Sequence, residues 1–425
     1  GYKSMLYLTA TGRNDWESQL AFSEASSFFY PSVGMSAVVS SMAKLPEWIS
    51  FLKVRGSYTE VGSSFERFIT RPSYQFNTAS GSWNSTTIYP ARNLKPEKTR
   101  SWELGINSKW LNNRLSFDLT YYRSNTINQT FTADLSISSG YSKAYIQSGS
   151  IRNEGIELAL GYSDKWGAFS WDSNLTFSCN NNKIMKLTEG ATNPMTGEPI
   201  NKDNYDMGQL GNLDARVKLY KGGSIGDVYA THRIKRDGNG HIFVSQDGDI
   251  EIESVDEFKL GSILPKANMG WSNNFSYKGI NLGVTLTARF GGIALSGTQS
   301  VLDQYGVSQK TADYRDAGGI AANYGYIDTE KYFDTVKGYA AYYTYSATNI
   351  RLAELNLSYT LPKEWFRDKL RMTVGLVGKN LWMIYCKAPF DPEATASTQS
   401  NYYQSYDYFM QPTTRNIGFS VKLNF

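Results

Sequence analysis

The chain has 425 residues and a formal net charge of +4, with charges of both signs dispersed along it. This balance gives no reason to expect a nucleic acid partner. Aromatic residues make up 14% of the chain, and 37 glycines accompany only 12 prolines, which favours β-strands joined by turns. No window has the roughly 18 uninterrupted apolar residues that a membrane-spanning helix needs, whereas membrane strands stay open because their alternating residues hide the apolar face from a hydropathy average.

The first residues, GYKSMLYLTATGRNDW, already resemble a strand and show no initiator Met, charged n-region or apolar h-region. We therefore expect the chain to be part of a longer one, or a product cut from one. Cys179 and Cys386 are too few for a disulfide scaffold or a metal cluster, and a single disulfide between them stays open.

Apolar and polar residues alternate with a period of two along most of the chain. Between 99 and 123, one face carries Trp102, Leu104 and Ile106, and the pattern resumes after a reversal at 112–113. This predicts a hairpin of two long strands.

The same alternation predicts further strands, about twelve in all. They lie at 2–12, 32–41, 51–61, 154–162, 170–178, 269–290 with a tight turn at 278–279, 352–362, 370–381 and 415–425. Several look ten residues or longer, whereas strands of soluble proteins average about five or six. No propeller repeat of about forty to fifty residues is visible. The predicted fold is therefore all-β, a transmembrane antiparallel β-barrel, with a soluble sandwich or propeller as the alternative.

The connections alternate in length, as in outer-membrane barrels with short periplasmic turns and long extracellular loops. Short ones lie near 42–50, 111–113, 163–168, 278–279 and 362–369, and long ones near 13–31, 62–97, 127–150, 182–264, 293–346 and 382–412. The short turns and the last strand carry aromatic residues that predict a periplasmic girdle at headgroup level: Trp48, Trp110, Trp166, Tyr277, Trp365, Phe366 and Phe425. The alternative is that aromatics are simply common in this chain.

Polar residues on the inward parity of the strands are predicted to face the lumen. They are Glu103, Lys109, Asp118, Thr285, Arg289, Arg371 and Lys379. Wetting the lumen and contacting a plug is the favoured role, and substrate selection is the alternative.

The long loops hold tyrosine clusters at 339–345 and 401–409. Tyr342, Tyr343, Tyr345, Tyr402, Tyr403, Tyr406 and Tyr408 could stack on sugar rings or hold peptide side chains, because Tyr has an apolar face and a hydrogen-bonding tip. Packing among the loops or against a partner protein is an equal alternative. The nearby FDPE stretch, Phe390 to Glu393, is predicted to be a turn that fixes its loop, since a residue before proline is restricted.

Catalytic chemistry is weakly indicated. GGSIG at 222–226 fits the G-x-S-x-G pattern around Ser224, with His232 nearby, but that motif requires a strand-to-helix elbow in an α/β sheet. A glycine-rich loop is favoured, and we expect no enzyme. His232 and His241 lack a Cys or a third His, so solvated loop residues are favoured over zinc ligands or general bases.

The stretch DGNGHIFVSQDGDIE at 237–251 resembles a cation loop with oxygen ligands from Asp237, Asn239, Asp247 and Asp249. It departs from the EF-hand pattern because Ile242 stands where the sharp turn needs Gly. Asp-Gly and Asn-Gly pairs form turns without a metal. No cofactor is therefore predicted, and a structural Ca²⁺ is the alternative.

Several stretches, read in order, resemble the C-terminal half of the SusC/RagA family of TonB-dependent outer-membrane transporters. They include GRNDWESQL with SFFYPSVGMSAVVS, LKVRGSYTEVG, the segment 93–126, GSIRNEGIELALGY, LGSILPKANMGWSNNFSYKGINL, RLAELNLSYTLP, GKNLW, APFDPE and TRNIGFSVKLNF. The terminal stretch also resembles the signal read by outer-membrane assembly machinery. The resemblance covers almost the whole chain.

The resemblance implies that residues 1–425 are strands 11 to 22 of a barrel of about 22 strands in a Gram-negative outer membrane, without the plug and N-terminal domains. It implies import of oligosaccharides or oligopeptides. The partners would be a SusD-like surface lipoprotein acting as a lid, TonB acting through the part missing here, outer-membrane lipid, and a dimer of transporter–lipoprotein pairs. Substrate and lid identity do not follow from the sequence.

Two other classes stay open. A self-contained barrel of about twelve strands could act as a passive pore or a membrane hydrolase, since the strand number is even. A surface adhesion or scaffold protein could use the long loops alone.

Overall fold

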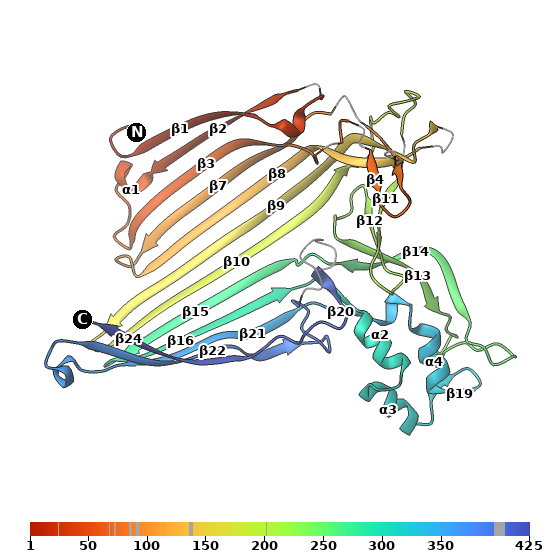
Figure 1. Cartoon of the computed structure of the whole chain (residues 1–425). Helices are drawn as coiled ribbons and strands as arrows, with labels where there is room; N and C mark the ends of the chain where they lie inside the picture. The colour runs from red at the N-terminus through yellow and green to blue at the C-terminus, as the bar shows by residue number, and fades with distance from the viewer. Residues whose placement is uncertain are drawn as a thin grey trace. The chain divides into compact units, whose positions relative to one another are not determined.

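The computed structural model describes residues 1–23, 25–67, 69–71, 74–84, 87–90, 94–135, 139–200, 202–394 and 404–425. These residues fold mostly as antiparallel strands in two compact units (Figure 1). The first unit comprises 1–162, 178–205 and 220–224, and the second comprises 163–177, 206–219 and 225–425. None of the helices found in the described residues is both long and apolar enough to cross a membrane.

The first unit is a series of long antiparallel strands. In order of pairing they are β1 (Leu6–Trp16), β2 (Ser27–Val38), β3 (Ile49–Ser63), β7 (Glu97–Trp110), β8 (Leu115–Asp134) and β9 (Lys143–Trp166). Short elements in the connections are η1 (Ser18–Leu20), α1 (Val39–Met42), β4 (Gln75–Asn77), β5 (Ser82–Asn84) and β6 (Ile88–Tyr89). β10 (Phe169–Lys186) begins in the second unit and ends in the first.

The second unit continues the pattern with strands from the rest of the chain. They pair in the order β15 (Ala267–Tyr277), β16 (Ile280–Phe290), β21 (Asn349–Thr360), β22 (Arg371–Cys386) and β24 (Asn416–Asn424), with η4 (Lys363–Phe366) in one turn. In the described part of the chain, the two units together hold twelve such strands. The strand number and the short turns predicted from the sequence are thus confirmed.

One face of the first unit's strands is apolar and ranges from half-buried to exposed, with Val54 at 38% and Ile106 at 41%. Val54 lies opposite Ile106, Ile106 opposite Leu119, and Leu119 opposite Leu158. Directly opposed residues share a face, so these four side chains form a row across β3, β7, β8 and β9. Period-2 alternation therefore gives each strand the apolar side that the sequence predicted.

The apolar face ends where charged residues begin on β8 and β9. Arg123 lies over the Trp102 ring, 5.8 Å from its centroid, and pairs with Glu154 at 2.7 Å. Beyond this pair β8 runs on to Asp134, and β9 starts as early as Lys143. The prediction of a long loop at 127–150 is therefore wrong. The strands extend past their apolar face, and β8 and β9 remain paired through the polar residues as far as Asp134 and Lys143.

The opposite face carries a polar network across β3, β7 and β8. The Arg55 guanidinium donates to Asp118 at 2.8 and 3.1 Å and to Thr120 at 2.6 Å, and Asn107 donates to Asp118 at 2.8 Å. Arg55 reaches Asp118 by lying over Gly105, where a Cβ would come within 2.6 Å of its Nε. Because Gly105 of β7 has no side chain, Arg55 of β3 can cross over β7 and reach Asp118 of β8.

Gly155 lies against backbone rather than against a side chain, so we expect a substitution at Gly155 to lower the stability of the protein. Its Cβ would overlap the backbone carbonyl oxygen of Cys179 and lie 2.7 Å from the Tyr122 hydroxyl. Gly155→Ala should therefore destabilise the protein by about 1–3 kcal/mol, because a backbone must shift. At Gly105 only the mobile Arg55 side chain must move, so Gly105→Ala should cost less. The comparison is made by urea unfolding in detergent, and equal losses of stability would contradict the argument.

The longest connections of the second unit are folded rather than irregular. β11 (Asn204–Gln209), β12 (Arg216–Tyr220), β13 (Asp227–Ile234) and β14 (Ile252–Ser262) form a four-stranded sheet, which is accompanied by α2 (Gly297–Gln304), α3 (Gln309–Asp316), α4 (Thr329–Val336) and η3 (Ala340–Tyr342). Small strands β17 (Ile293–Ser296), β18 (Ile320–Ala322), β19 (Gly325–Ile327), β20 (Thr344–Ser346) and β23 (Tyr406–Asp407) complete it. We call residues 206–219, 225–264, 293–346 and 404–409 the loop domain.

The loop domain has its own hydrophobic core. Its fully buried members include Leu213, Val217, Val228, Ile242, Leu295, Phe333, Val336 and Tyr343. The helices were not predicted from the sequence, although each begins at a capping residue whose side chain accepts from backbone N–H groups, as expected for Ser and Asp: Ser296, Ser308 and Asp328. In α4 the buried Tyr332, Phe333 and Val336 follow helical spacing, and this signal could have revealed it.

Candidate functional site

The tyrosine clusters lie in the loop domain, and two of the predicted contact residues are buried in its core. Tyr343 is 0% exposed and Tyr406 is 2% exposed. Neither ring can touch a ligand in this structure, so the hypothesis of direct substrate contact does not fit these two. The alternative role, packing among the loops, fits both tyrosines.

Tyr406 connects three segments of the loop domain. Its ring fits against Gly211 and its hydroxyl against Gly297, where a Cβ would collide with them. The hydroxyl hydrogen-bonds with the Asn212 side chain and accepts from the Asn212 N–H at 3.1 Å. Its backbone pairs in parallel with Leu295 of β17. The segment 404–409 is thereby inserted between the 206–219 segment and the start of α2.

Residues following Tyr406 strengthen this insertion. Asp407 accepts a hydrogen bond from the buried Ser296 hydroxyl at 2.7 Å, and the Phe409 N–H donates to the Thr298 hydroxyl at 2.6 Å. Ser296 also caps α2 by accepting from the Gln299 N–H at 2.9 Å. One hydroxyl therefore links the helix start to the last long connection.

Of the other predicted contact residues, Tyr342 and Tyr345 have protein partners, whereas Tyr408 is exposed. The Tyr342 hydroxyl accepts from the Ile234 N–H at 2.9 Å, and Tyr345 packs edge-on against Phe390 at 5.7 Å. Burial raises the pKa of Tyr345 to about 12, so its hydroxyl stays protonated. Tyr408 is 48% exposed and stays a predicted contact for ligand or partner. Tyr402 and Tyr403 lie outside the described residues.

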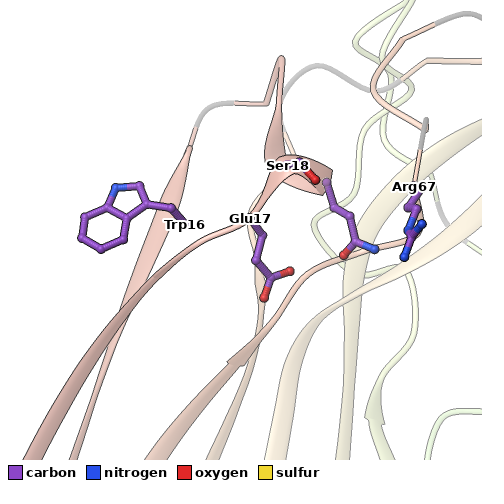
Figure 2. A pocket seen from close by; sticks show the side chains of 5 residues that line it. Trp16, Glu17, Ser18 and Arg67 are labelled. Carbon is purple, nitrogen blue, oxygen red and sulfur yellow. The ribbon is translucent and has the colours of Figure 1, made fainter.

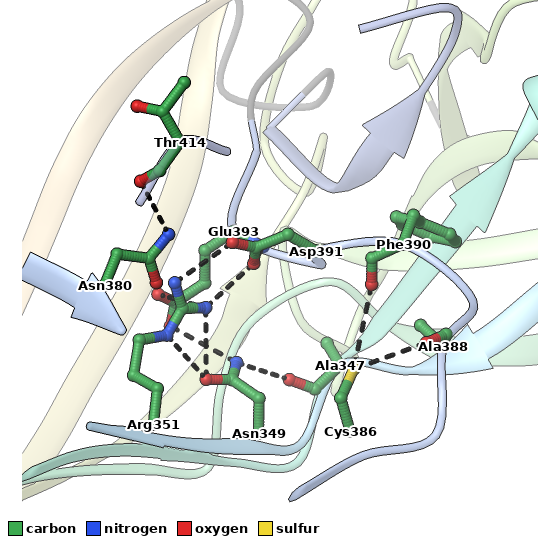
Figure 3. A network of polar contacts seen from close by, with 10 residues as sticks. All are labelled: Ala347, Asn349, Arg351, Asn380, Cys386, Ala388, Phe390, Asp391, Glu393 and Thr414. Carbon is green, nitrogen blue, oxygen red and sulfur yellow. Dashed lines mark hydrogen bonds and ion pairs between the residues drawn. The ribbon is translucent and has the colours of Figure 1, made fainter. Parts of the chain in front are cut away.

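A buried charged network that the sequence did not single out surrounds Arg351 (Figure 3). Its guanidinium donates to both Asp391 oxygens at 3.0 and 2.8 Å and to Glu393 at 3.0 Å. Asn349 accepts from Nε and Nη2 at 3.3 and 3.2 Å. Asp391 and Glu393 belong to the FDPE stretch, so Arg351 holds this turn against the start of β21.

Asp391 is ionised within this network. Burial raises the pKa of its carboxyl, but hydrogen bonds from Arg351 and from the Glu393 N–H outweigh burial and lower the pKa below its usual value. The predicted loop-fixing turn is therefore held by an ion pair rather than by proline alone.

The predicted lumen-facing residues all lie on the polar faces of their strands. Asp118 is opposite Asn107, Thr285 is opposite Ser272, and Arg371 is opposite Asn424. Lys379 faces both Glu354 and Asn416, Arg289 is opposite Asn268, and Glu103 and Lys109 are opposite Tyr122 and Ser116. Asp118 is committed to Arg55, which favours a structural role for it. Substrate selection by the others stays a prediction.

The predicted girdle residues lie at the short turns. Trp48 and Trp110 come from neighbouring turns of the first unit and touch edge-on at 5.5 Å. In the second unit Trp166 stacks on Phe169 at 5.9 Å, Tyr277 ends β15, and Trp365 and Phe366 lie in η4. Phe425 follows β24 and is 98% exposed. Their role at a lipid interface stays a prediction.

The weak chemical motifs take ordinary structural roles. Ser224 lies in a turn before β13, not at a strand-to-helix elbow, and donates to Asn182 at 3.3 Å. His232 contacts Asp214 through Nδ1 at 3.1 Å and stacks on Tyr339 at 5.3 Å. Cys179 and Cys386 are free thiols, so the disulfide left open by the sequence is absent.

The 237–251 stretch forms two turns, and two of the predicted cation ligands there, Asp237 and Asp249, have protein partners. Asp237 accepts from the N–H groups of Asn239 and His241 at 2.9 and 2.8 Å, and Asp249 pairs with Lys331 at 2.9 Å. The described residues contain no group of three His, Cys, Asp or Glu side chains arranged for a metal ion. These contacts support turn formation, the alternative weighed against calcium.

A recess of about 620 Å³ lies at the C-terminal end of β1 (Figure 2). Trp16, Glu17, Ser18, Gln19 and Arg67 line it, and the Trp16 ring points away from Arg67. Its residues come from connections that the sequence placed on the extracellular side.

Among the connections that the structure describes, Glu189 has a carboxyl pKa that is strongly lowered. The hydrogen bond from Lys221, at 2.7 Å, and that from the Leu187 N–H lower the pKa of Glu189 from 4.5 to about 2. Because the folded pKa is lowered, the stabilisation is complete above pH 4.5 and is lost as the pH falls from 4.5 toward 2.

We expect Lys221→Met to move this loss to higher pH, because the largest cause of the lowered Glu189 pKa is removed while the hydrogen bond from the Leu187 N–H remains. Hydrogen exchange of peptides covering 187–191, normalised for intrinsic rates, would measure it between pH 6 and pH 2.5. The effect should be small, because both side chains are partly exposed and screened. Lys186→Met is the control for loss of a nearby charge. Identical pH profiles for wild type and Lys221→Met would contradict the assignment.

Comparison with known proteins identifies the family. The model of the family described as TonB dependent receptor-like, β-barrel, matches residues 3–249. The chain belongs to this family. The predicted SusC/RagA resemblance and the antiparallel barrel fold are thereby confirmed.

Individual relatives agree with this membership. TonB-dependent receptor P3 of Formosa agariphila is 25% identical over all of this chain and 44% of its own length, and TonB-dependent receptor SusC of Bacteroides thetaiotaomicron is 23% identical over 73% of this chain and 31% of its own length. The solved structure of the RagAB peptide importer in its open-open state matches the whole chain and 46% of its own chain, with a TM-score of 0.77 and 19% identity. The chain spans less than half the length of these relatives.

Proposed function

We propose that this chain forms part of the barrel of a TonB-dependent importer in the outer membrane of a Gram-negative bacterium. The importer takes up oligosaccharides or oligopeptides together with a SusD-like lipoprotein lid, and it pairs with a second transporter–lipoprotein unit. Family membership and the similarity to SusC and to the RagAB peptide importer support this proposal.

The observation that carries the proposal is the contrast between the two faces of the long strands. The apolar face of β7 is exposed, with Leu104 at 58%, whereas the opposite face holds the Arg55–Asp118 network. A soluble protein rarely exposes a continuous apolar face, but a membrane barrel requires one toward lipid.

The unpaired edge of β24 favours a barrel with more strands than those described. β24 pairs on one side with β22, and its other edge has no strand partner among the described residues of the second unit. Ile417 and Phe419 on β24 are 80% and 83% exposed. A long apolar edge strand is an aggregation hazard unless it is paired, so the proposal places the remaining barrel strands, the plug and the TonB-coupling segment in the rest of the protein.

Native purification from outer membranes, with mass spectrometry of every co-purifying chain, tests this proposal. We expect a polypeptide roughly twice the 47.7 kDa of this chain, or a plug-bearing companion, together with a lipoprotein. Uptake of labelled oligosaccharide or peptide should stop when TonB is deleted. A folded 47.7 kDa chain that passes solutes alone and without TonB would favour a passive pore instead.

A further inference from the structure

The loop domain carries a second recess that the proposed import mechanism does not use. Its cavity measures about 580 Å³, within the range of about 300–1,000 Å³ typical of small-ligand sites. It lies between the turn at 244–248, the β18–β19 hairpin and the first turn of α4. Val244, Gln246, Ala322, Tyr324, Tyr326 and Asp328 are among its lining residues.

Hydrogen bonds hold the walls of this recess in place. The Asn323 side chain accepts from the Val244 N–H at 3.0 Å and donates to the Val244 carbonyl at 3.3 Å, so the hairpin is fixed to the turn. Lys331 of α4 donates to the Gly248 carbonyl at 2.7 Å and to Asp249 at 2.9 Å. Val244 itself is buried in the loop-domain core. The recess is therefore pre-formed.

Three of the side chains that line the recess, Tyr324, Tyr326 and Gln246, are by contrast exposed. Tyr324 and Tyr326 are 76% and 68% exposed. Within the described part of the chain, neither ring packs on another aromatic, and neither hydroxyl nor the exposed Gln246 amide makes a hydrogen bond. Asp328 caps α4 with Oδ1, which accepts from the N–H groups of Glu330 and Lys331, and its other oxygen is left for a ligand.

We propose that this recess binds a neutral oligosaccharide at the cell surface. A pyranose has an apolar face of C–H groups and a rim of hydroxyls, which suits the face and tip of tyrosine. Tyr324 and Tyr326 supply two such rings in the lining, and the Gln246 amide and the free Asp328 oxygen can pair with the hydroxyl rim. Ordering cost is low because the frame is already rigid.

A peptide fits the recess less well. An apolar side chain would need an enclosed apolar pocket, whereas the apolar residues of the lining are the small Ala322 and the buried Val244 and Ile327, which offer little apolar surface. A negatively charged side chain or C-terminus would need a free positive charge, and Lys331, which lines the recess, is already paired with Asp249. A neutral ligand needs no such partner.

The test is a binding measurement on the intact protein purified in detergent, which requires neither TonB nor transport. Saturation-transfer NMR is recorded with maltohexaose, cellohexaose, xylohexaose and laminarihexaose, and Kd is obtained by titration of any binder. The variants are Tyr324→Ala, Tyr326→Ala, their combination and Gln246→Ala. Tyr305→Ala removes another exposed tyrosine of the loop domain, 72% exposed, and serves as the matched control.

We expect at least one of the four hexaoses to bind, the double variant to weaken its binding at least tenfold, and Tyr305→Ala to leave Kd unchanged. All substituted side chains are exposed, and unchanged limited-proteolysis patterns would verify folding. Binding of none of the hexaoses would overturn the proposal, as would a double variant with the wild-type Kd. Tyr324- and Tyr326-dependent binding of hexa-alanine in place of every hexaose would also overturn it and would assign the recess to peptides. Loss of TonB-dependent uptake alone would not affect this inference.

Discussion

Replacing Arg351 with Met is expected to release the FDPE turn from the start of β21 and the end of β22. Arg351 is 9% exposed and satisfies both oxygens of Asp391, whose side chain is 8% exposed. Removing one partner of a buried ion pair leaves an uncompensated charge and costs about 3–5 kcal/mol. The neutral Met side chain keeps the length of the arginine stem, so the effect isolates the charge.

Cys386 supplies the measurement for this prediction. Its thiol donates to the carbonyls of Ala388 and Phe390 at 3.5 and 3.7 Å, so it lies beneath the turn that Arg351 holds. Opening the turn should increase the rate of Cys386 alkylation on the order of a hundredfold, since about 1.4 kcal/mol corresponds to tenfold. Cys179, the other free thiol, gives the reference rate in the same sample.

Two further variants make the Arg351 result specific. Arg371→Met removes an exposed arginine from β22 and should change stability by less than about 0.5 kcal/mol. The triple variant Arg351→Met, Asp391→Asn and Glu393→Gln removes the uncompensated charges and should recover much of the protection. An unchanged Cys386 rate in Arg351→Met would show that the turn is held by other contacts.

The strands were predictable because their signal is local. Alternation fixes which side of a strand is apolar, and turn residues fix where it reverses. At 278–279, for example, Lys278 and Gly279 both have positive φ, as the commonest two-residue hairpin turn requires, and Tyr277 pairs with Ile280. The sequence pattern contained all of this information.

The site was less predictable because its contacts join distant segments. Arg351 and Asp391 are 40 positions apart, and Asn212 and Tyr406 are 194 apart. A cluster such as YAAYYTY gives the same composition whether its rings pack inward or face a ligand, so only the fold separates the buried Tyr343 from the exposed Tyr408. The helices of the loop domain were not predicted either. They are short, and their capping residues, Ser296, Ser308 and Asp328, lie in a chain whose dominant alternating pattern favours strands.

Tyr406→Ala is expected to loosen the loop domain as a whole. Truncating a buried aromatic typically costs about 3–5 kcal/mol, and here the ring contacts both the 206–219 segment and the start of α2. Hydrogen exchange of peptides covering 206–219 and 293–304 should therefore rise in both segments. Tyr406→Phe keeps the ring and loses the hydroxyl that bonds with Asn212, so it should cost less than Tyr406→Ala, about 1 kcal/mol.

Tyr408→Ala is the matched control, because Tyr408 stacks on Tyr406 at 6.2 Å but is 48% exposed. It should leave exchange in both segments close to wild type. If Tyr408 contacts the lipoprotein lid, as the proposed function allows, Tyr408→Ala should reduce the amount of co-purifying lipoprotein without loosening the domain. In that case Tyr406→Ala would reduce the amount of lipoprotein by disordering the surface that the proposed lid would contact. Equal exchange in the two variants would contradict the view that Tyr406 holds the last long connection in the loop domain.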